Sequence, residues 1–197
     1  MSVAVTALGG FEEPVQQAQI AFRVLLDAMA QPGRIVDVPK VNALPEGIAP
    51  ASASVMLSLL DASTRLWLAP DLDTMSATTY FRFHTGCENT SVPGDANFAL
   101  IQGFNSGLLS QFAIGTPEYP DRSTTVLVQV DALSEDSGPR LTGPGIESER
   151  RLKVEGVAQD FWENVCLNNS NFPLGIDLVL VRGDQVACLP RSIKVEV

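Results

Sequence analysis

Four side chains of this 197-residue sequence have the chemical groups of a small binding or catalytic site: Arg34, His84, Asp177 and Arg191. A guanidinium can hold two oxygens of a phosphate or phosphonate group at once, and an imidazole or a carboxylate can exchange protons. Each of the four lies near a point where a predicted helix or strand begins or ends. They are therefore our candidate binding or interface residues.

Asp177 and Arg191 stand at the mouth of a predicted β-hairpin. Asp177 lies one residue inside an apolar strand, and Arg191 follows Pro190 at the point where the second strand leaves the sheet. An acid and a base placed in this way can face each other across a sheet edge, or can line a cleft. We favour a structural ion pair or two solvated charges, because most such pairs near a protein surface have no other role.

The segment His84-Thr85-Gly86-Cys87 is the most chemically capable local cluster. Histidine exchanges protons near neutral pH and could activate a thiol three residues away. A histidine and a cysteine that follow a helix more often cap that helix or pack in the core. We favour this structural interpretation over catalysis.

Two further segments have open interpretations. Arg34 follows Pro32-Gly33 and could bind a phosphate oxygen, or equally cap the last carbonyl groups of the preceding helix. The glycines of Leu141-Thr-Gly-Pro-Gly-Ile146 permit positive φ angles or the close approach of another backbone. An anion-binding nest or a protein contact is conceivable there, and a simple turn is favoured.

The sequence lacks the signatures of several common classes of enzyme. The single histidine rules out a His-Glu-x-x-His zinc site, and neither a phosphate-binding P-loop, a dinucleotide fingerprint nor a Gly-x-Ser-x-Gly elbow occurs. The three lysines, Lys40, Lys153 and Lys194, stand outside Schiff-base motifs. We expect no metal and no cofactor, and in particular no bound pyridoxal phosphate.

The composition indicates a globular protein with an acidic surface. There are 23 acidic and 13 basic residues, which give a formal charge of −10. This charge opposes binding to nucleic acid and to anionic membranes, so we expect neither partner. The sequence has neither a secretory leader pattern nor a long apolar run, and its three cysteines are odd in number and widely spaced. We expect a cytoplasmic protein with reduced thiols.

The elements that must position the candidate residues centre on the C-terminal hairpin. Ile176 to Val181 is an apolar, β-branched run typical of a strand covered on both faces. Arg182-Gly183-Asp184-Gln185 supplies turn residues, and Val186 to Leu189 returns as the second strand. Further upstream, Pro14 begins a helix in which one apolar face is predicted to contain Val15, Ala18, Phe22, Leu25, Leu26 and Met29.

The remaining pattern alternates helices and strands in the first half of the chain, and strands dominate the second half. We predict helices near 14–31, 51–61, 74–82 and 158–168, a short helix at 108–114, and strands near 35–38, 65–69, 97–101, 124–130, 151–155 and 193–197. Residues 1–197 are therefore expected to form a single domain of the α/β class. Its sheet should be mixed, partly antiparallel and flanked by helices.

Five of these segments together resemble the PhnH family, the H subunits of bacterial carbon–phosphorus lyase. Their order and spacing extend over nearly the whole chain. The segments are Leu26–Arg34, Phe83–Cys87, Leu141–Ile146, Phe172–Asp177 and Leu189–Arg191. Gln31 departs from the family pattern, in which a basic residue precedes the Pro-Gly pair, and Arg34 is then the only arginine of that motif.

The resemblance implies a function well beyond what the residues alone indicate. Family members belong to a cytoplasmic assembly that lets bacteria use alkylphosphonates as a source of phosphorus. One step replaces the adenine of ATP with a phosphonate, which gives a ribose 1-phosphonate 5-triphosphate. The I subunit is regarded as catalytic for this step, the G and H subunits are needed beside it, and the J subunit later breaks the C–P bond by radical iron–sulfur chemistry.

Two hypotheses for this chain follow from the resemblance. In the favoured one, the chain is an accessory subunit of this transferase complex with no activity alone, a homodimer in isolation and a partner of the G, I and J subunits in the cell. In the other, Arg34, His84, Asp177 and Arg191 form an anion-binding site for phosphonate or triphosphate. The resemblance also implies a fold similar to the large domain of pyridoxal-phosphate-dependent transferases, without the cofactor.

Overall fold

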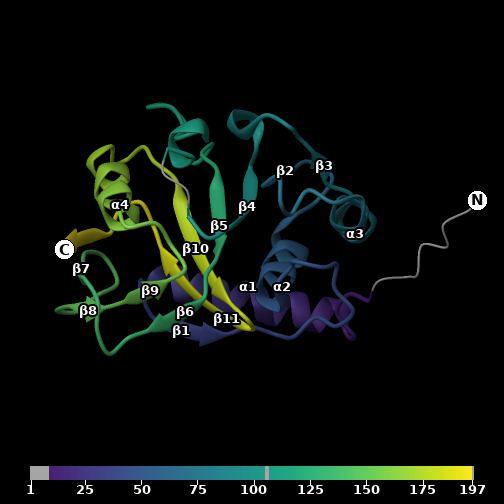
Figure 1. The fold of residues 1–197 in the computed structure, drawn as a ribbon, viewed down its shortest axis with the longest axis horizontal. Helices are drawn as coiled ribbons and strands as arrows, with labels where there is room; N and C mark the ends of the chain where they lie inside the picture. The colour runs from purple at the N-terminus through teal and green to yellow at the C-terminus, as the bar shows by residue number, and fades with distance from the viewer. Residues whose placement is uncertain (1–8, 105–106, 197) are drawn as a thin grey trace, which may run out of the picture.

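A mixed sheet forms the centre of the molecule (Figure 1). In the computed structural model, which describes residues 9–104 and 107–196, seven strands lie in the order β1-β11-β10-β5-β4-β2-β3. Neighbours from β10 to β3 run parallel, and the β10–β11 and β11–β1 pairs are antiparallel. The strands are β1 (Ile35–Asp37), β2 (Arg65–Leu68), β3 (Glu88–Asn89), β4 (Phe98–Gln102), β5 (Thr125–Gln129), β10 (Asp177–Arg182) and β11 (Gln185–Leu189). The predicted mixed α/β sheet is confirmed, and most of it is parallel.

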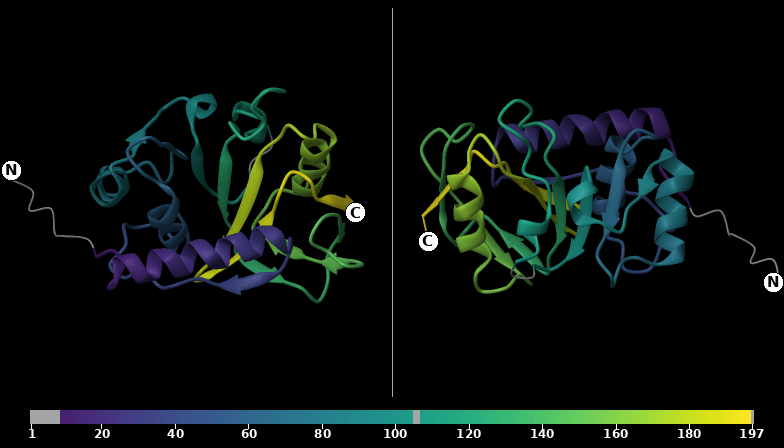
Figure 2. Two further views of the ribbon diagram at one scale, coloured as in Figure 1. Left: turned by 180° about the vertical axis from the view of Figure 1, so that it is seen from behind. Right: turned by 90° about the horizontal axis from the view of Figure 1, so that it is seen from above.

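Helices cover both faces of this sheet (Figure 2). One face packs against α1 (Pro14–Ala30), α2 (Pro50–Leu59) and α3 (Met75–Thr85), and the other packs against α4 (Phe161–Ser170). The hairpin strand β10 shows why two layers are needed: Val179 and Val181 enter the first core, while Leu178 and Leu180 enter the second. None of the helices in the described part of the chain is long and apolar enough to cross a membrane.

Short strands beside the main sheet replace several of the predicted elements. β12 (Lys194–Glu196), β7 (Arg140–Thr142) and β8 (Arg150–Arg151) form one small sheet, and β6 (Ala132–Ser134) pairs with β9 (Lys153–Glu155) in another. The single strand predicted at 151–155 is therefore two strands that belong to different sheets. The short helix predicted at 108–114 is a 3-10 turn, Leu109–Gln111, and a second such turn is Pro93–Asp95. Val197, the predicted end of the last strand, lies outside the described residues.

The apolar face predicted for α1 is wrong in part. Val15, Phe22 and Leu26 are exposed, Val15 to 85%. The buried side of the helix contains Ala21, Leu25 and Ala28 instead. The small alanine side chains let the helix lie close to α2 and β11. In this orientation the larger side chains of Val15, Phe22 and Leu26 point towards solvent.

A buried glutamine joins α2 to the carboxyl end of β5. Gln129 Oε1 accepts hydrogen bonds from the backbone N–H of Ala49 at 2.7 Å and from Ser52 Oγ at 2.9 Å. Its Nε2 donates to the carbonyl oxygen of Gly47 at 2.8 Å and to Gln102 Oε1 at 2.7 Å. Both lone pairs of Oε1 and both N–H groups of Nε2 are used, so Gln129 fixes where α2 begins.

Replacing this glutamine should destabilise the fold. The Gln129→Leu substitution leaves the N–H of Ala49 and the hydroxyl of Ser52 without their acceptor in the core, and we expect the free energy of unfolding to fall by about 3 kcal/mol. Urea denaturation measures the change. The matched control is Gln16→Leu on the exposed side of α1, which should change stability by no more than about 0.5 kcal/mol. Equal effects of the two substitutions would contradict this role of Gln129.

Candidate functional site

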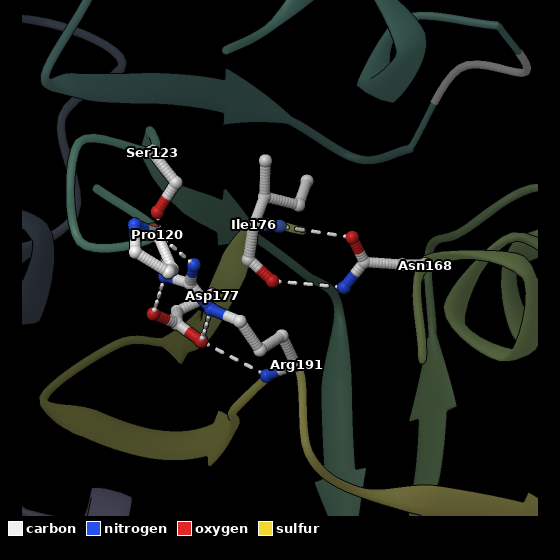
Figure 3. A network of polar contacts seen from close by, with 6 residues as sticks. All are labelled: Pro120, Ser123, Asn168, Ile176, Asp177 and Arg191. Atoms are coloured by element: carbon white, nitrogen blue, oxygen red, sulfur yellow. Dashed lines mark hydrogen bonds and ion pairs between the residues drawn. The ribbon is translucent and has the colours of Figure 1, made fainter. Parts of the chain in front are cut away.

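Asp177 and Arg191 form a close ion pair at the mouth of the hairpin (Figure 3). Arg191 Nε donates to Asp177 Oδ1 at 3.1 Å, and Nη2 donates to Oδ2 at 2.5 Å. The backbone N–H of Arg191 also donates to Oδ1, at 2.9 Å. This is the two-pronged arrangement in which a guanidinium and a carboxylate match best.

Arg191 also binds the loop that precedes β5. Its Nη1 donates to the carbonyl oxygen of Pro120 at 2.6 Å, and its Nη2 donates to Ser123 Oγ at 2.5 Å. The side chain of Arg191 is only 12% exposed, and that of Asp177 is 23% exposed. Four of the five N–H groups of the guanidinium are thus used inside the protein, which leaves little of it for a ligand.

The chain just before Asp177 is held by α4. Asn168 Oδ1 accepts the N–H of Ile176 at 2.9 Å, and Asn168 Nδ2 donates to the carbonyl oxygen of Ile176 at 2.8 Å (Figure 3). The amide of Asn168 therefore pairs with Ile176 as a neighbouring strand would. Gly175 has φ +130°, and a side chain there would come within 2.8 Å of Asn168 Oδ1. Glycine is needed for this close approach.

The position of the ion pair in the sheet also favours a structural role. Asp177 lies opposite Thr125, so the pair is at the amino ends of the parallel strands β5 and β10. Ligands of open α/β sheets bind beyond the carboxyl ends of the strands. The structural ion pair favoured from the sequence agrees with this geometry.

Arg34 lies at the end of α1, away from that network. Its Nη1 donates to Gln31 Oε1 at 3.0 Å, and the residue is exposed. Arg150, which the sequence analysis did not single out, caps the helix instead: its Nη1 donates to the carbonyl oxygens of Gln31 at 2.8 Å and Pro32 at 2.9 Å. The only signal for this role was a pair of arginines after the glycine-rich segment 141–146.

That glycine-rich segment packs against the end of α1. Gly145 has φ +85°, and a side chain there would collide with the carbonyl oxygen of Ala30. A side chain at Gly33 would come within 2.5 Å of Leu141 Cδ1, and the N–H of Gly33 donates to the carbonyl oxygen of Cys188 at 2.9 Å. Two of the motif segments, Leu26–Arg34 and Leu141–Ile146, therefore meet at this helix end beside β11, and their glycines are explained by close packing within the chain.

His84 lies on α3, which covers the β2–β3 end of the sheet, whereas the hairpin lies towards the opposite edge (Figure 1). Its ring stacks on Tyr80, with 4.7 Å between ring centroids, and a side chain at Gly10 would lie 2.9 Å from its Cε1 atom. Cys87 is fully buried, and burial raises the pKa of its thiol. A raised pKa reduces the thiolate fraction that a nucleophile needs.

The structure thus brings Asp177 and Arg191 together and places Arg34 and His84 on other elements. Within residues 9–104 and 107–196, no group of three or more His, Cys, Asp or Glu side chains could hold a metal ion. The arrangement at the hairpin mouth can join three segments of the chain. Among the described residues it offers no open anion site, because the guanidinium of Arg191 is engaged by Asp177, Pro120 and Ser123.

Removing the arginine of this pair should cost stability. Arg191→Met removes the guanidinium donors of a partly buried carboxylate, which keeps only the backbone N–H of residue 191, and leaves the carbonyl group of Pro120 without its donor, so we expect the free energy of unfolding to fall by about 2 to 3 kcal/mol. Urea denaturation again measures it. Arg34→Met, an exposed arginine with one side-chain partner among the described residues, is the control and should be nearly neutral. A loss no larger than that of the control would contradict the structural role.

The three cysteines should differ in reactivity. Burial raises the pKa of all three thiols, but Cys87 and Cys188 are buried, whereas Cys166 is partly exposed and can be reached by a reagent. With a disulfide reagent such as DTNB at pH 8, one thiol should react in the folded chain and all three after unfolding in urea. In Cys166→Ser the folded chain should react only slowly. Rapid reaction of Cys87 in that variant would support activation by His84 instead.

Comparison with known proteins identifies the family. A family model described as bacterial phosphonate metabolism protein (PhnH) matches residues 9–196. The chain is 41% identical over 190 residues to the alpha-D-ribose 1-methylphosphonate 5-triphosphate synthase subunit PhnH of Rhizobium meliloti (strain 1021), which covers 95% of this chain and 94% of the relative. It is 37% identical over 174 residues to the putative C-P lyase subunit protein HtxG of Stutzerimonas stutzeri, with 88% and 83% covered. The resemblance found in the sequence is confirmed, and the chain belongs to the PhnH family of bacterial phosphonate metabolism proteins.

Proposed function

We propose that this chain is an accessory subunit of a carbon–phosphorus lyase assembly. It is required there for the formation of ribose 1-phosphonate 5-triphosphate from ATP and an alkylphosphonate, with release of adenine. The observation that carries this proposal is the similarity over almost the whole chain to relatives that are named as subunits of a synthase and of a C-P lyase. The assembly is cytoplasmic, its other members are the G, I and J subunits, and the isolated chain is a homodimer.

The geometry of the candidate residues supports an accessory role. The guanidinium of Arg191 is engaged by Asp177, Pro120 and Ser123, and the thiol of Cys87 is buried. A catalytic subunit for phosphonate transfer would need donors free to bind the charged oxygens of its substrates. The hairpin mouth instead uses its donors to hold the fold, so its contribution to the assembly is a defined surface.

The second candidate function is direct binding of phosphonate or triphosphate. Arg34 favours it, since this exposed guanidinium donates only to Gln31 among the described residues and keeps other N–H groups available. Arg34 would then act from a surface shared with another subunit. This alternative and the accessory role differ in what Arg34 does after assembly.

Co-expression with the G, I and J subunits tests the proposal. Adenine release from ATP and methylphosphonate is measured by chromatography for the assembly and for the isolated chain. We expect adenine release only from the assembly. Arg34→Met and His84→Asn should assemble and keep adenine release within about threefold of wild type, because ordinary surface substitutions have small effects.

Two results would contradict the accessory role. One is adenine release by the isolated chain. The other is normal assembly of Arg34→Met or His84→Asn with a large loss of adenine release, which would assign that residue to substrate binding. The Asp177→Ala, Arg191→Ala double variant serves as the comparison, since it should fail to assemble through loss of its fold.

A further inference from the structure

The two edges of the central sheet differ in whether their outward backbone groups have partners. At the β1 edge, the N–H of Ile35 donates to Glu135 Oε1 at 2.6 Å, so a side chain covers that edge. At the other edge, β3 pairs with β2 through the N–H groups of Glu88 and Thr90, which donate to Thr64 and Leu66. Asn89 alternates with these residues, and among the described residues no strand pairs with its outer side. An open strand edge is a template for another extended chain.

A cavity of about 800 Å³ lies along this open edge. Leu66 and Leu68 of β2 are among its apolar lining residues, and Thr79 and Arg82 line it from α3. Asn89 and Ser91 line it from β3 and the residues that follow. Figures 1 and 2 place α3 and β3 together at one end of the molecule, where nothing lies beyond them among the described residues except the start of the chain. The cavity is therefore where the side chains of one more strand would fit under α3.

Unpaired charges line this cavity at two places. Arg82 has no ion pair within 4.0 Å in the described part of the chain. Asp73 likewise has no basic partner there, whereas Glu88 pairs with Arg65 at 3.7 Å. Asp73 lies just before Thr74, the N-cap of α3, and Arg82 lies in the last turn of that helix, so the two charges line the cavity from opposite ends of α3.

We propose that the open edge of β3 and the cavity beside it receive an extended segment of a partner protein, which adds to the sheet as a further strand. This inference rests on the proposed role as a subunit and names the surface through which that role is exercised. The added strand hydrogen-bonds to the backbone of Asn89. Its inward side chains present a carboxylate to Arg82 and a basic group to Asp73.

A second copy of this chain fits the surface less well. The copy would offer its own edge, Glu88-Asn89-Thr90-Ser91, which contains an acid and no base. Asp73 would then remain without a partner, and Glu88 would lie near its own symmetry copy, where like charges repel. Charge complementarity thus favours a different protein over self-association through β3.

Hydrogen exchange measured by mass spectrometry tests the inference on the assembly of this chain with co-expressed G, I and J subunits. The amide groups of the segment 88–91 should exchange at least tenfold more slowly in the assembly than in the isolated chain. Exchange at the same rate in both would overturn the inference. Slow exchange already in the isolated chain, increasing with its concentration, would identify a second copy as the occupant and would also overturn it.

Two substitutions test the contacts separately. Asn89→Pro removes the outward N–H, which an edge strand tolerates, and Arg82→Glu reverses the charge of the cavity. Each should weaken binding to the partners at least tenfold while the urea midpoint of the isolated chain stays the same. The control is Arg182→Glu, an exposed arginine at the end of β10 away from this cavity, which should bind as wild type does. Normal binding by Asn89→Pro would contradict the proposal, and normal binding by Arg82→Glu alone would contradict the charge contact within it.

The wild-type chain separates this inference from the proposed function. If wild type does not co-purify with the G, I and J subunits, the subunit role itself fails. If wild type assembles and Asn89→Pro assembles equally well, the role stands and only the docking surface is wrong.

Discussion

The ion pair between Arg191 and Asp177 is the interaction on which the rest of the hairpin region depends. One guanidinium joins the start of β10, the exit of β11 and the loop that leads into β5. The loop lies 71 residues before Arg191, and the network also satisfies two backbone groups, the carbonyl oxygen of Pro120 and the N–H of Arg191. Because the pair is only partly exposed, its strength comes from good geometry and from the additional neutral partners that satisfy the arginine.

Side chains from distant segments also hold the ends of two helices. Gln129 holds the first turn of α2 at the carboxyl end of β5, while Arg150 closes the last turn of α1. Both side chains satisfy backbone groups that a helix end leaves free. The helices on this face of the sheet are therefore positioned by side chains from distant parts of the chain as well as by apolar packing.

Much of this fold could be predicted from the sequence, and the failures have physical causes. The run from Ile176 to Val181 predicted a strand buried on both faces, since apolar character alone sets that outcome, and for Asp177 with Arg191 the sequence favoured an ion pair or two solvated charges, of which the structure has the ion pair. The roles of Gln129 and Arg150 depend on partners about eighty and more than one hundred residues away, which no local pattern reveals. The apolar face predicted for α1 includes the buried Leu25 but also three exposed side chains, because helical periodicity shows that an apolar stripe exists and cannot show that Ala21 and Ala28 pack against the core in place of part of it.

The exposed apolar side chains of α1 affect how molecules of this chain interact in solution. The exposed apolar side chains of Val15, Phe22 and Leu26 favour association between molecules, whereas a formal charge of −10 makes molecules repel one another. These two forces respond differently to ions, because salt screens the repulsion and leaves the apolar attraction in place. The tendency of molecules of this chain to associate in solution is thus governed by ionic strength.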